Sequence, residues 1–276
     1  TYQGKQCTEY AVANSAARRA VRGPPSGAGE SGGKGKRVDL GGRSGAGKKT
    51  LFKLACGLEK PHSGQVNVAG LNTATARPPA LAKRVSLMFQ EAERQICHHR
   101  VDTEVGFSPR LAGYSKPEIH ARVCQALEMT GLSGKADRHP LDLNAGERRL
   151  VTLAALIAQD TPLILLDEPT RDFDRPLLAR FEQWMQRVRG EGRAILFISH
   201  DLDFVARHAN RVIHLSGGQI IADGDAVSVL HHPHLQTETS LAPTLPALCQ
   251  ALGFSPTSQP EEFDAQWRRH LRDRRN

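Results

Sequence analysis

The chain has 276 residues, of which 39% are hydrophobic and 24% are charged. At about 150 residues per domain, this length predicts one large two-lobed domain or nearly two domains. The composition, with a mean hydropathy of −0.42, is typical of a soluble globular protein and excludes a mostly disordered chain. The longest apolar stretch, residues 150–158, is far shorter than the roughly 20 residues that span a bilayer, which excludes an integral membrane protein.

Basic residues are in excess: lysine and arginine outnumber aspartate and glutamate by 37 to 29, for a formal net charge of +8. This balance favours polyanionic partners such as nucleic acid, anionic lipid headgroups or phosphorylated ligands. The 5 cysteines never form a C-x-x-C pair, so we expect neither a disulfide framework nor a structural zinc site, and we favour a reducing cytoplasm. No segment has the order of charged, apolar and small residues that marks a secretory signal.

The pattern along the chain predicts an α/β fold with a helical insertion between about residues 100 and 160. The first 35 residues are expected to be irregular, because the glycines and prolines of residues 23–35 oppose both helix and strand. Strands are expected at residues 37–40, 66–68, 85–89, 162–166 and 194–198, with a hairpin at 212–222. Helices are expected up to residue 54, at residues 145–158 and 175–189, and from Asp201. The capping-box spacing of Ser115 and Glu118 opens a further helix that is expected to end near Gly131.

Residues 42–48 match the pattern G-x-x-x-x-G-K, and they lie between an expected strand and an expected helix. In this setting glycines allow backbone N–H groups to converge on phosphate oxygens, and Lys48 reaches the β- and γ-phosphates. The segment therefore predicts a nucleotide-binding loop, against the alternative of a glycine-rich turn with a chance lysine. Its candidate binding residues are Gly42, Arg43, Ser44, Gly45, Ala46, Gly47, Lys48, Lys49 and Thr50.

A second candidate site follows the apolar run of residues 163–166. Asp167 ends this expected strand, where its carboxylate can hold the water shell of Mg²⁺, and the adjacent Glu168 can accept a proton from an attacking water. Two solvated carboxylates at a strand end are the alternative. Their position after a phosphate-binding loop, and the Pro169 and Thr170 that follow them, favour the catalytic interpretation.

These two motifs and three others resemble, in the same order, the motifs of the nucleotide-binding subunit of ATP-binding cassette (ABC) transporters. Phe89 and Gln90 resemble the glutamine loop of that family, and residues 143–147 resemble its Leu-Ser-Gly-Gly-Gln signature. Residues 172–174 resemble the D-loop, and His200 resembles the histidine switch. The resemblance implies a P-loop NTPase (RecA-like) fold, an α/β core with a parallel sheet and an inserted helical subdomain. The expected divisions are an irregular segment at 1–35, a cassette domain at 36–230 with its helical subdomain at about 98–158, and a C-terminal extension at 231–276.

A narrower resemblance is to the ATPases of energy-coupling factor importers, the cobalt, nickel and vitamin uptake group. Residues 89–96 are similar to the Phe-Gln-Asn-Pro-Glu-Asp-Gln-Leu/Ile segment of that group, and residues 104–109 to its Glu-Val-Ala-Phe-Gly-Pro. The resemblance implies a subunit that binds and hydrolyses ATP with Mg²⁺ and powers solute import through a membrane transporter. It implies a second ABC subunit as a partner, in a homodimer or a heterodimer, and a transmembrane transporter subunit. It also implies peripheral association with the cytoplasmic face of the cell membrane, with nucleic acid not an expected partner.

The same resemblance implies roles for individual residues. The implied catalytic residues are Glu168, His200 and Gln90, and the implied metal ligands are Asp167 and Gln90. Asn144 and Gly146 of the signature would contact the γ-phosphate of the ATP bound to the partner subunit. The segment after Gln90, with Arg94 and Arg100, would face the transmembrane partner.

Three departures from the family pattern predict reduced hydrolytic competence. Lys49 stands where the family has the Ser or Thr that ligates Mg²⁺, and an ammonium group repels a cation instead of ligating it. Thr50 lies about 100° further around the helix, where it cannot replace that hydroxyl. In the signature, Asn144 replaces serine but keeps a hydrogen-bond donor, whereas Ala145 adds a Cβ where glycine permits close approach. Asp39 places a carboxylate within the strand that leads into the phosphate loop.

Two other functions are compatible with the sequence: a nucleotide-binding, hydrolytically degenerate subunit that pairs with an active paralogue, and a soluble cassette ATPase that acts on nucleic acid. Two histidine clusters, at residues 97–99 and 231–234, lack a known metal-ligand spacing and are expected to be exposed loops. The basic run at residues 268–275 is expected to be a solvated helix end, with contact to anionic lipid or nucleic acid as the alternative.

Overall fold

The computed structural model describes residues 8–13, 42–43, 47–216, 218–230, 244–255, 257 and 260–273. The chain divides into two compact units. The terminal unit comprises residues 1–13, 37–48 and 198–276, and the central unit comprises residues 14–36 and 49–197. None of the helices within the described ranges combines the length and the apolar character that crossing a bilayer requires.

The centre of the central unit is a group of short strands in the order β5 (Val85–Met88), β6 (Leu163–Asp167) and β7 (Ala194–Ser199). The last two residues of β7 belong to the terminal unit. β5 and β6 run parallel, in a register that pairs Val85 with Leu163 and Met88 with Leu166. Every residue of β6 and β7 is buried, which explains the continuous apolar runs in the sequence. The predicted α/β fold with a parallel sheet is therefore confirmed.

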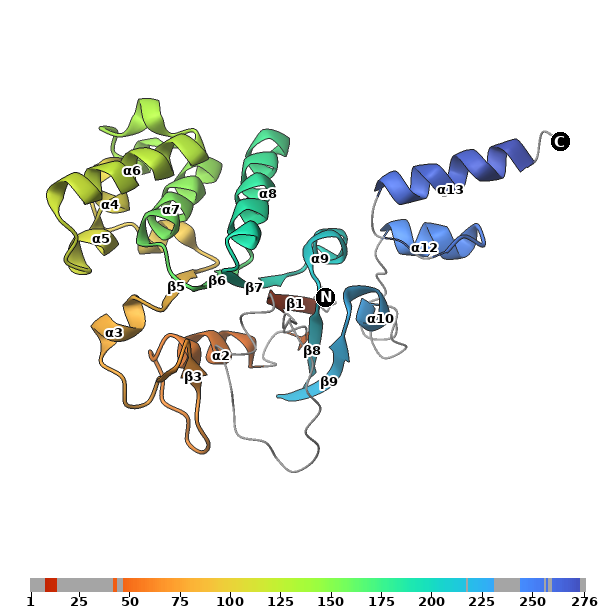
Figure 1. Ribbon diagram of the computed structural model, residues 1–276, viewed down its shortest axis with the longest axis horizontal. Helices are drawn as coiled ribbons and strands as arrows, with labels where there is room; N and C mark the ends of the chain where they lie inside the picture. The colour runs from red at the N-terminus through yellow and green to blue at the C-terminus, as the bar shows by residue number, and fades with distance from the viewer. Residues whose placement is uncertain are drawn as a thin grey trace, which may run out of the picture. The chain divides into compact units, whose positions relative to one another are not determined.

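Helices make up most of the rest of the central unit. They are α2 (Lys48–Ala55), α3 (Pro78–Ala82), α4 (Val101–Val105), α5 (Phe107–Leu111), α6 (Lys116–Thr130), α7 (Ala145–Gln159) and α8 (Arg175–Gly190), with 3-10 turns at Ala92–Gln95, Ser133–Lys135 and Pro140–Asp142. A short hairpin of β3 (Asn67–Val68) and β4 (Leu71–Asn72) follows α2 in the sequence. α6 packs along α7 and, with α4 and α5, forms the helical part between β5 and β6 (Figure 1).

α6 begins and ends where the sequence predicts. Its N-cap is Ser115, whose backbone N–H donates to the Glu118 carboxylate at 2.8 Å and whose hydroxyl donates to the same carboxylate at 2.6 Å. The hydrogen bond from the hydroxyl is the main reason that the pKa of Glu118 lies below its usual value. The C-cap, Gly131, has a φ of 73°, a left-handed conformation that glycine adopts without strain.

The terminal unit contains an antiparallel sheet and several helices. In this sheet β1 (Thr8–Ala13) pairs with β2 (Gly42–Arg43) and with β8 (Val212–Ser216), and β8 forms a hairpin with β9 (Gln219–Gly224), as predicted. The described helices of this unit are α9 (Leu202–His208), α10 (Ala226–Leu230), α12 (Thr244–Ala251) and α13 (Pro260–Asp273). The backbone N–H and hydroxyl of Thr244 donate to the Asp203 carboxylate at 2.6 and 2.7 Å, which ties the start of α12 to α9.

β1 corrects the expectation of an irregular segment over residues 1–35. Residues 8–13 contain Thr, Tyr and Val at alternate positions, a pattern that favours a strand, and the glycines and prolines further along obscured it. The strand predicted at residues 37–40, with Asp39, lies outside the described residues. The sequence did not predict β4 and α3, and within the predicted helical insertion it did not distinguish α4 and α5; these elements have at most five residues each.

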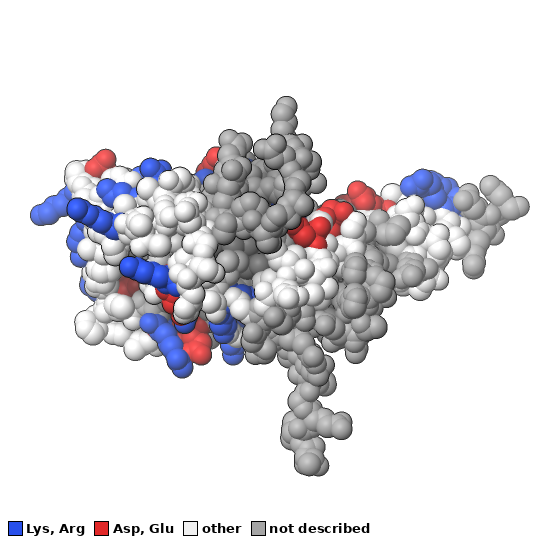
Figure 2. Space-filling view, turned by 90° about the horizontal axis from the view of Figure 1, so that it is seen from below, with Lys and Arg blue, Asp and Glu red and all other residues white. Residues whose placement is uncertain are grey.

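The two ends of α13 carry opposite charges. Glu261 and Glu262 lie in its first turn and Arg272 in its last, an order that matches the helix dipole. Figure 2 shows basic side chains gathered near the C-terminal end of the chain. Arg268 pairs with Asp264 at 2.8 Å and is 71% exposed. In the described part of the basic run, these side chains therefore face solvent, as expected of a helix end.

We predict that Leu165→Ala, in the middle of β6, lowers the free energy of unfolding by about 2–5 kcal/mol, because Leu165 is fully buried and the change leaves a cavity. Urea denaturation followed by circular dichroism measures the effect. Leu141→Ala is the control, since this leucine is 60% exposed and its truncation should change stability little. Equal losses in both variants would contradict the position of β6 in the core.

Candidate functional site

The predicted phosphate-binding loop is described in part. Gly42 and Arg43 form β2, whereas Ser44, Gly45 and Ala46 lie outside the described residues. Gly47 has a φ of 96°, a conformation that L-residues with a side chain rarely adopt. Lys48 follows as the first residue of α2 and is buried. The described end of the loop thus has the glycine and the buried lysine at a helix start that a phosphate site requires.

Lys49 is the second residue of α2, and it contacts a residue that the sequence analysis assigned to the metal. Its Nζ donates to Oε1 of Gln90 at 2.7 Å, across 41 positions of sequence. Gln90 follows the carboxyl end of β5 and is half-buried, whereas Lys49 is exposed. The amide oxygen expected to ligate Mg²⁺ therefore accepts a hydrogen bond from an ammonium group.

This contact does not fit a magnesium site of the usual kind. Mg²⁺ requires oxygen ligands in near-octahedral geometry, and the side chain of Lys49 has no oxygen to offer. Two unit charges 4 Å apart repel by about 1 kcal/mol in water and about 4 kcal/mol near a protein surface, and a divalent ion doubles both values. An ion bound to Gln90 would therefore have to displace the Lys49 ammonium group.

The carboxylates predicted for catalysis lie at the end of β6. Asp167 is its last residue and is 4% exposed, and Glu168 follows at 8% exposed. Glu168 has a φ of 51° and Asp172 a φ of 64°, both in the left-handed region that is strained for residues other than glycine. Since β5 and β6 are parallel neighbours, Gln90 and Glu168 follow the same edge of the sheet.

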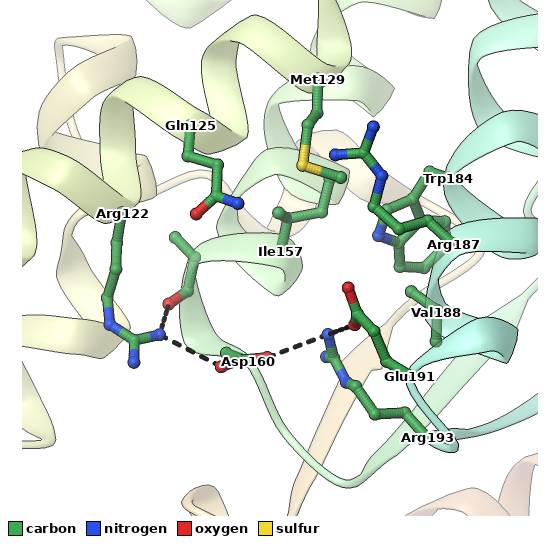
Figure 3. Close-up of a pocket in the computed structure, with 11 residues that line it drawn as sticks. Arg122, Gln125, Met129, Ile157, Asp160, Trp184, Arg187, Val188, Glu191 and Arg193 are labelled. Atoms are coloured by element: carbon green, nitrogen blue, oxygen red, sulfur yellow. Dashed lines mark hydrogen bonds and ion pairs between the residues drawn. The ribbon is translucent and has the colours of Figure 1, made fainter.

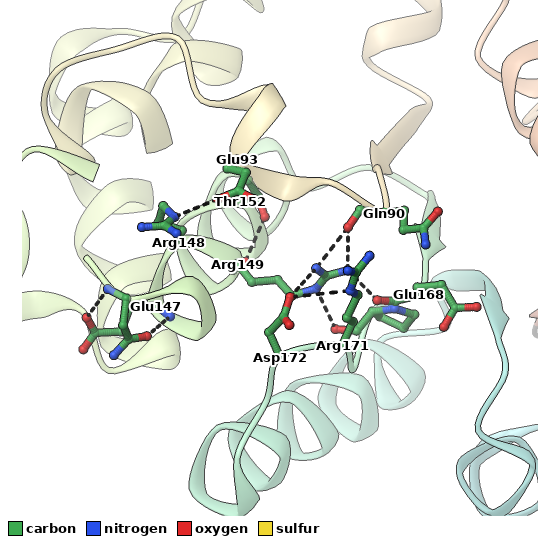
Figure 4. A network of polar contacts seen from close by, with 11 residues as sticks. Gln90, Glu93, Glu147, Arg148, Arg149, Thr152, Glu168, Arg171 and Asp172 are labelled. Carbon is green, nitrogen blue, oxygen red and sulfur yellow. Dashed lines mark hydrogen bonds and ion pairs between the residues drawn. The ribbon is translucent and has the colours of Figure 1, made fainter. Parts of the chain in front are cut away.

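A buried arginine that the sequence analysis did not identify holds these loops together (Figure 4). Arg149, in the second turn of α7, donates to the backbone carbonyl of Gln90 at 3.1 Å, to that of Pro169 at 3.3 Å and to that of Glu168. Its guanidinium also lies 3.6 Å from the Asp172 carboxylate. Burial lowers the pKa of Arg149, although Asp172 opposes the shift. The side chain thus joins the glutamine loop, the end of β6 and the D-loop.

The signature residues have structural roles at the start of α7. Asn144 is the N-cap: its Oδ1 accepts from the backbone N–H of Glu147 at 2.8 Å, which leaves its amide group as a donor. Glu147 pairs with Lys135, and this hydrogen bond holds the pKa of Glu147 below its usual value. Gly146 packs tightly, because a Cβ there would lie 3.0 Å from the Asp172 carbonyl oxygen and 2.6 Å from Leu177.

His200, which resembles the histidine switch in sequence, follows β7 directly. The next residue, Asp201, is the N-cap of α9: its Oδ1 accepts from the backbone N–H of Phe204 at 2.9 Å, and its own N–H donates to the Ser199 hydroxyl at 3.1 Å. Hydrogen bonds on both sides therefore fix the backbone that carries His200.

The histidines near residue 98 have structural partners. Glu104 accepts from the backbone N–H groups of Cys97 and His98, at 3.0 and 2.9 Å, and lies 2.8 Å from Nδ1 of His98. Nδ1 of His99 lies 3.1 Å from Nε2 of His139. Within the described ranges no group of three or more His, Cys, Asp or Glu could hold a metal ion. The cluster at residues 231–234 lies outside those ranges.

A cavity of about 210 Å³ between α6, α7 and α8 is lined in part by paired charges (Figure 3). Arg122 and Arg193 approach the Asp160 carboxylate from two sides, at 3.5 and 2.9 Å. Asp160 is the C-cap of α7, and Arg122 also donates to the carbonyl of Ala158 at 3.3 Å. These contacts stabilise the end of α7, so we assign no ligand to this cavity.

The role of Arg149 predicts a large loss of stability in Arg149→Leu. The change removes the donor that three carbonyl oxygens share, and each unsatisfied buried group costs about 1–3 kcal/mol, so we expect a total loss of at least about 3 kcal/mol in urea denaturation. Arg171→Leu is the control, because Arg171 lies in the loop after β6 that Arg149 contacts and is 54% exposed. Similar losses in both variants would contradict the role of Arg149.

Gly146→Ala should also destabilise the protein, by about 1–3 kcal/mol, because the backbone oxygen of Asp172 cannot move away cheaply from the new methyl group. The matched control is Gly190→Ala in α8, where an added Cβ meets nothing within 4 Å. We expect Gly190→Ala to leave the Tm unchanged or slightly raised. A Gly146→Ala protein that melts at the parent temperature would refute this packing.

Comparisons with known sequences agree with the motifs. The model of the family described as ABC transporter matches residues 31–171. A protein of Pyrococcus furiosus named as an ABC transporter ATP-binding protein is 34% identical over 222 residues, 80% of this chain and 85% of that protein. The nickel import ATP-binding protein NikO of Rhodobacter capsulatus is 36% identical over 218 residues, 76% of this chain and 86% of that protein. The chain spans only 38% of an ABC transporter ATP-binding protein of Methanosarcina mazei, with 37% identity.

Solved structures share the fold. The structure of cbiO1 from Clostridium perfringens, described as part of the ABC transporter complex cbiONQ, has a TM-score of 0.62 and 25% identity, and the match covers 76% of this chain and 84% of that one. The dimeric structure of MJ0796, a bacterial ABC transporter cassette, has a TM-score of 0.61 and 20% identity, with 78% and 98% covered. The chain belongs to the ABC transporter family, as an ATP-binding protein with the fold of its P-loop ATPases.

Proposed function

We propose that the chain is the ATP-binding and ATP-hydrolysing subunit of a membrane transporter of the energy-coupling factor group, that it powers solute import, and that its hydrolytic competence is reduced. The observation that carries this proposal is that Gln90 and Glu168 follow adjacent parallel strands and that the buried Arg149 bonds to both backbones. The similarity to a nickel import ATP-binding protein supports import as the process. The cytoplasmic face of the membrane is the location that this function requires.

The proposal assigns a separate role in nucleotide binding or hydrolysis to each candidate site residue. Lys48 and the loop of residues 42–47 bind the phosphates, and Glu168 accepts the proton of the attacking water. Gln90 and His200 contact the reacting phosphate and complete the catalytic set. Asp167 remains a proposed metal ligand. The cassette domain at residues 36–230, its helical subdomain at about 98–158 and the extension at 231–276 are part of the same proposal.

The proposed partners are a second ABC subunit and a transmembrane subunit. The amide of Asn144, at the N-terminus of α7, would reach the nucleotide held by the second subunit, and the dimeric structure of the cassette MJ0796 supports such pairing. The transmembrane subunit would dock on the segment after Gln90, where Phe107, Leu111 and Tyr114 are exposed. Leu111 and Tyr114 also line a cavity of about 640 Å³ between α3 and α5, which suits an apolar partner.

A second candidate function is a degenerate subunit that binds nucleotide and pairs with an active paralogue. The contact between Lys49 and Gln90 favours it, because this contact occupies an oxygen on which hydrolysis in the family depends. Phosphate release by the chain alone, and mixed with candidate partners, separates the two functions. Slow release by the chain alone supports the first, and nucleotide binding with release only in the mixture supports the second.

We predict that Glu168→Gln lowers phosphate release by about 10²-fold or more and leaves nucleotide binding within a few-fold, because the amide cannot accept a proton. Turnover is measured with Mg²⁺ present, and binding by fluorescence of a nucleotide analogue. The matched control is Glu191→Gln, an exposed residue after α8 that pairs with Arg193, which should release phosphate at the parent rate. Equal turnover in Glu168→Gln and in the parent would exclude Glu168 as the base.

A further inference from the structure

The charge at the start of α2 is unusual for a helix N-terminus. Lys48 and Lys49 are its first two residues, and no acidic residue lies in its first turn. Cations are disfavoured at this end of a helix, because the backbone N–H groups already give it a positive potential. Adjacent lysines add mutual repulsion. A polyanion bound at this end would offset both of these unfavourable effects.

The side chain of Lys49 is directed by a specific contact. Its Nζ donates to Oε1 of Gln90 at 2.7 Å, across 41 positions of sequence. An ammonium group has three N–H donors, and the bond to Gln90 uses one of them. The remaining two donors can bind phosphate oxygens while Gln90 keeps the side chain in place.

We propose that Lys49 supplies from within the chain the positive charge that a divalent cation supplies in other ABC ATPases, so that this chain binds nucleoside triphosphate without requiring a divalent cation. The inference rests on the proposed nucleotide-binding function. The observations that carry it are the Lys49–Gln90 bond and the pair of lysines at the start of α2. Metal-free ATP carries more negative charge than its magnesium complex, and Lys49 attracts the first and repels the metal of the second.

The proposal predicts an inverted metal dependence of binding. The full chain is titrated with a fluorescent ATP analogue, once in excess EDTA and once in excess Mg²⁺. In the parent protein, the Kd in EDTA should equal or fall below the Kd in Mg²⁺. In Lys49→Ser, which restores a hydroxyl and frees Gln90, the Kd in EDTA should rise about tenfold or more above the Kd in Mg²⁺.

Lys53→Ser is the matched control, because Lys53 lies on the same helix and pairs with Glu59 at 2.8 Å. Its ratio of the two Kd values should equal that of the parent. Circular dichroism melting of all three proteins checks folding, which the exposed position of Lys49 should leave intact. A thermal shift with ATP in EDTA, compared with ATP in Mg²⁺, gives a second readout that does not depend on turnover.

The outcomes distinguish this inference from the function on which it rests. Parent binding that is tenfold tighter in Mg²⁺, with the same ratio in Lys49→Ser, overturns the inference and leaves the proposed function standing. Absence of nucleotide binding under both conditions overturns both. A parent ratio at or below one that reverses in Lys49→Ser, with Lys53→Ser unchanged, supports the inference.

Discussion

The central unit depends on one buried guanidinium group. Arg149 reaches from α7 to the carbonyl oxygens of Gln90, Glu168 and Pro169, and its planar fork of five N–H groups is the side chain that suits several diverging acceptors. Glu168 and Asp172, two of the residues it contacts, have left-handed backbone conformations that cost of order 1–3 kcal/mol each. The contacts of Arg149 therefore stabilise a strained turn that carries the proposed base, and they tie it to the glutamine loop.

Two signature residues, Asn144 and Gly146, have structural roles that do not depend on a nucleotide. Asn144 caps α7, a function that serine would serve equally, so this replacement preserves the local structure. Gly146 permits the close approach of the D-loop, whose Asp172 carbonyl would otherwise meet a methyl group. Lys49 differs from both, because its side chain is exposed and contacts Gln90 instead of packing in the core.

The sequence predicted elements whose signals are local. The apolar run of β6, the capping box of α6 and the glycines between β8 and β9 are signals that each span only a few residues, and β6, α6 and the hairpin of β8 and β9 are all present. It could not predict α4 and α5, because five residues are too few to show a helical period. Arg149 was missed because its partners are backbone carbonyls, which leave no trace in residue type. The Lys49–Gln90 bond joins positions 41 apart, beyond the range of any local pattern.

The cysteines of the described ranges differ in reactivity because of where the fold places them. Cys56 follows α2, and burial raises its pKa to about 12, so its thiol stays protonated near neutral pH. Cys97 and Cys124 are exposed, one beside the glutamine loop and the other on α6. A maleimide reagent would therefore label these two thiols well before Cys56. The native chain thus carries attachment points for spectroscopic probes on two neighbouring parts of the helical region, one of them a few residues from Gln90.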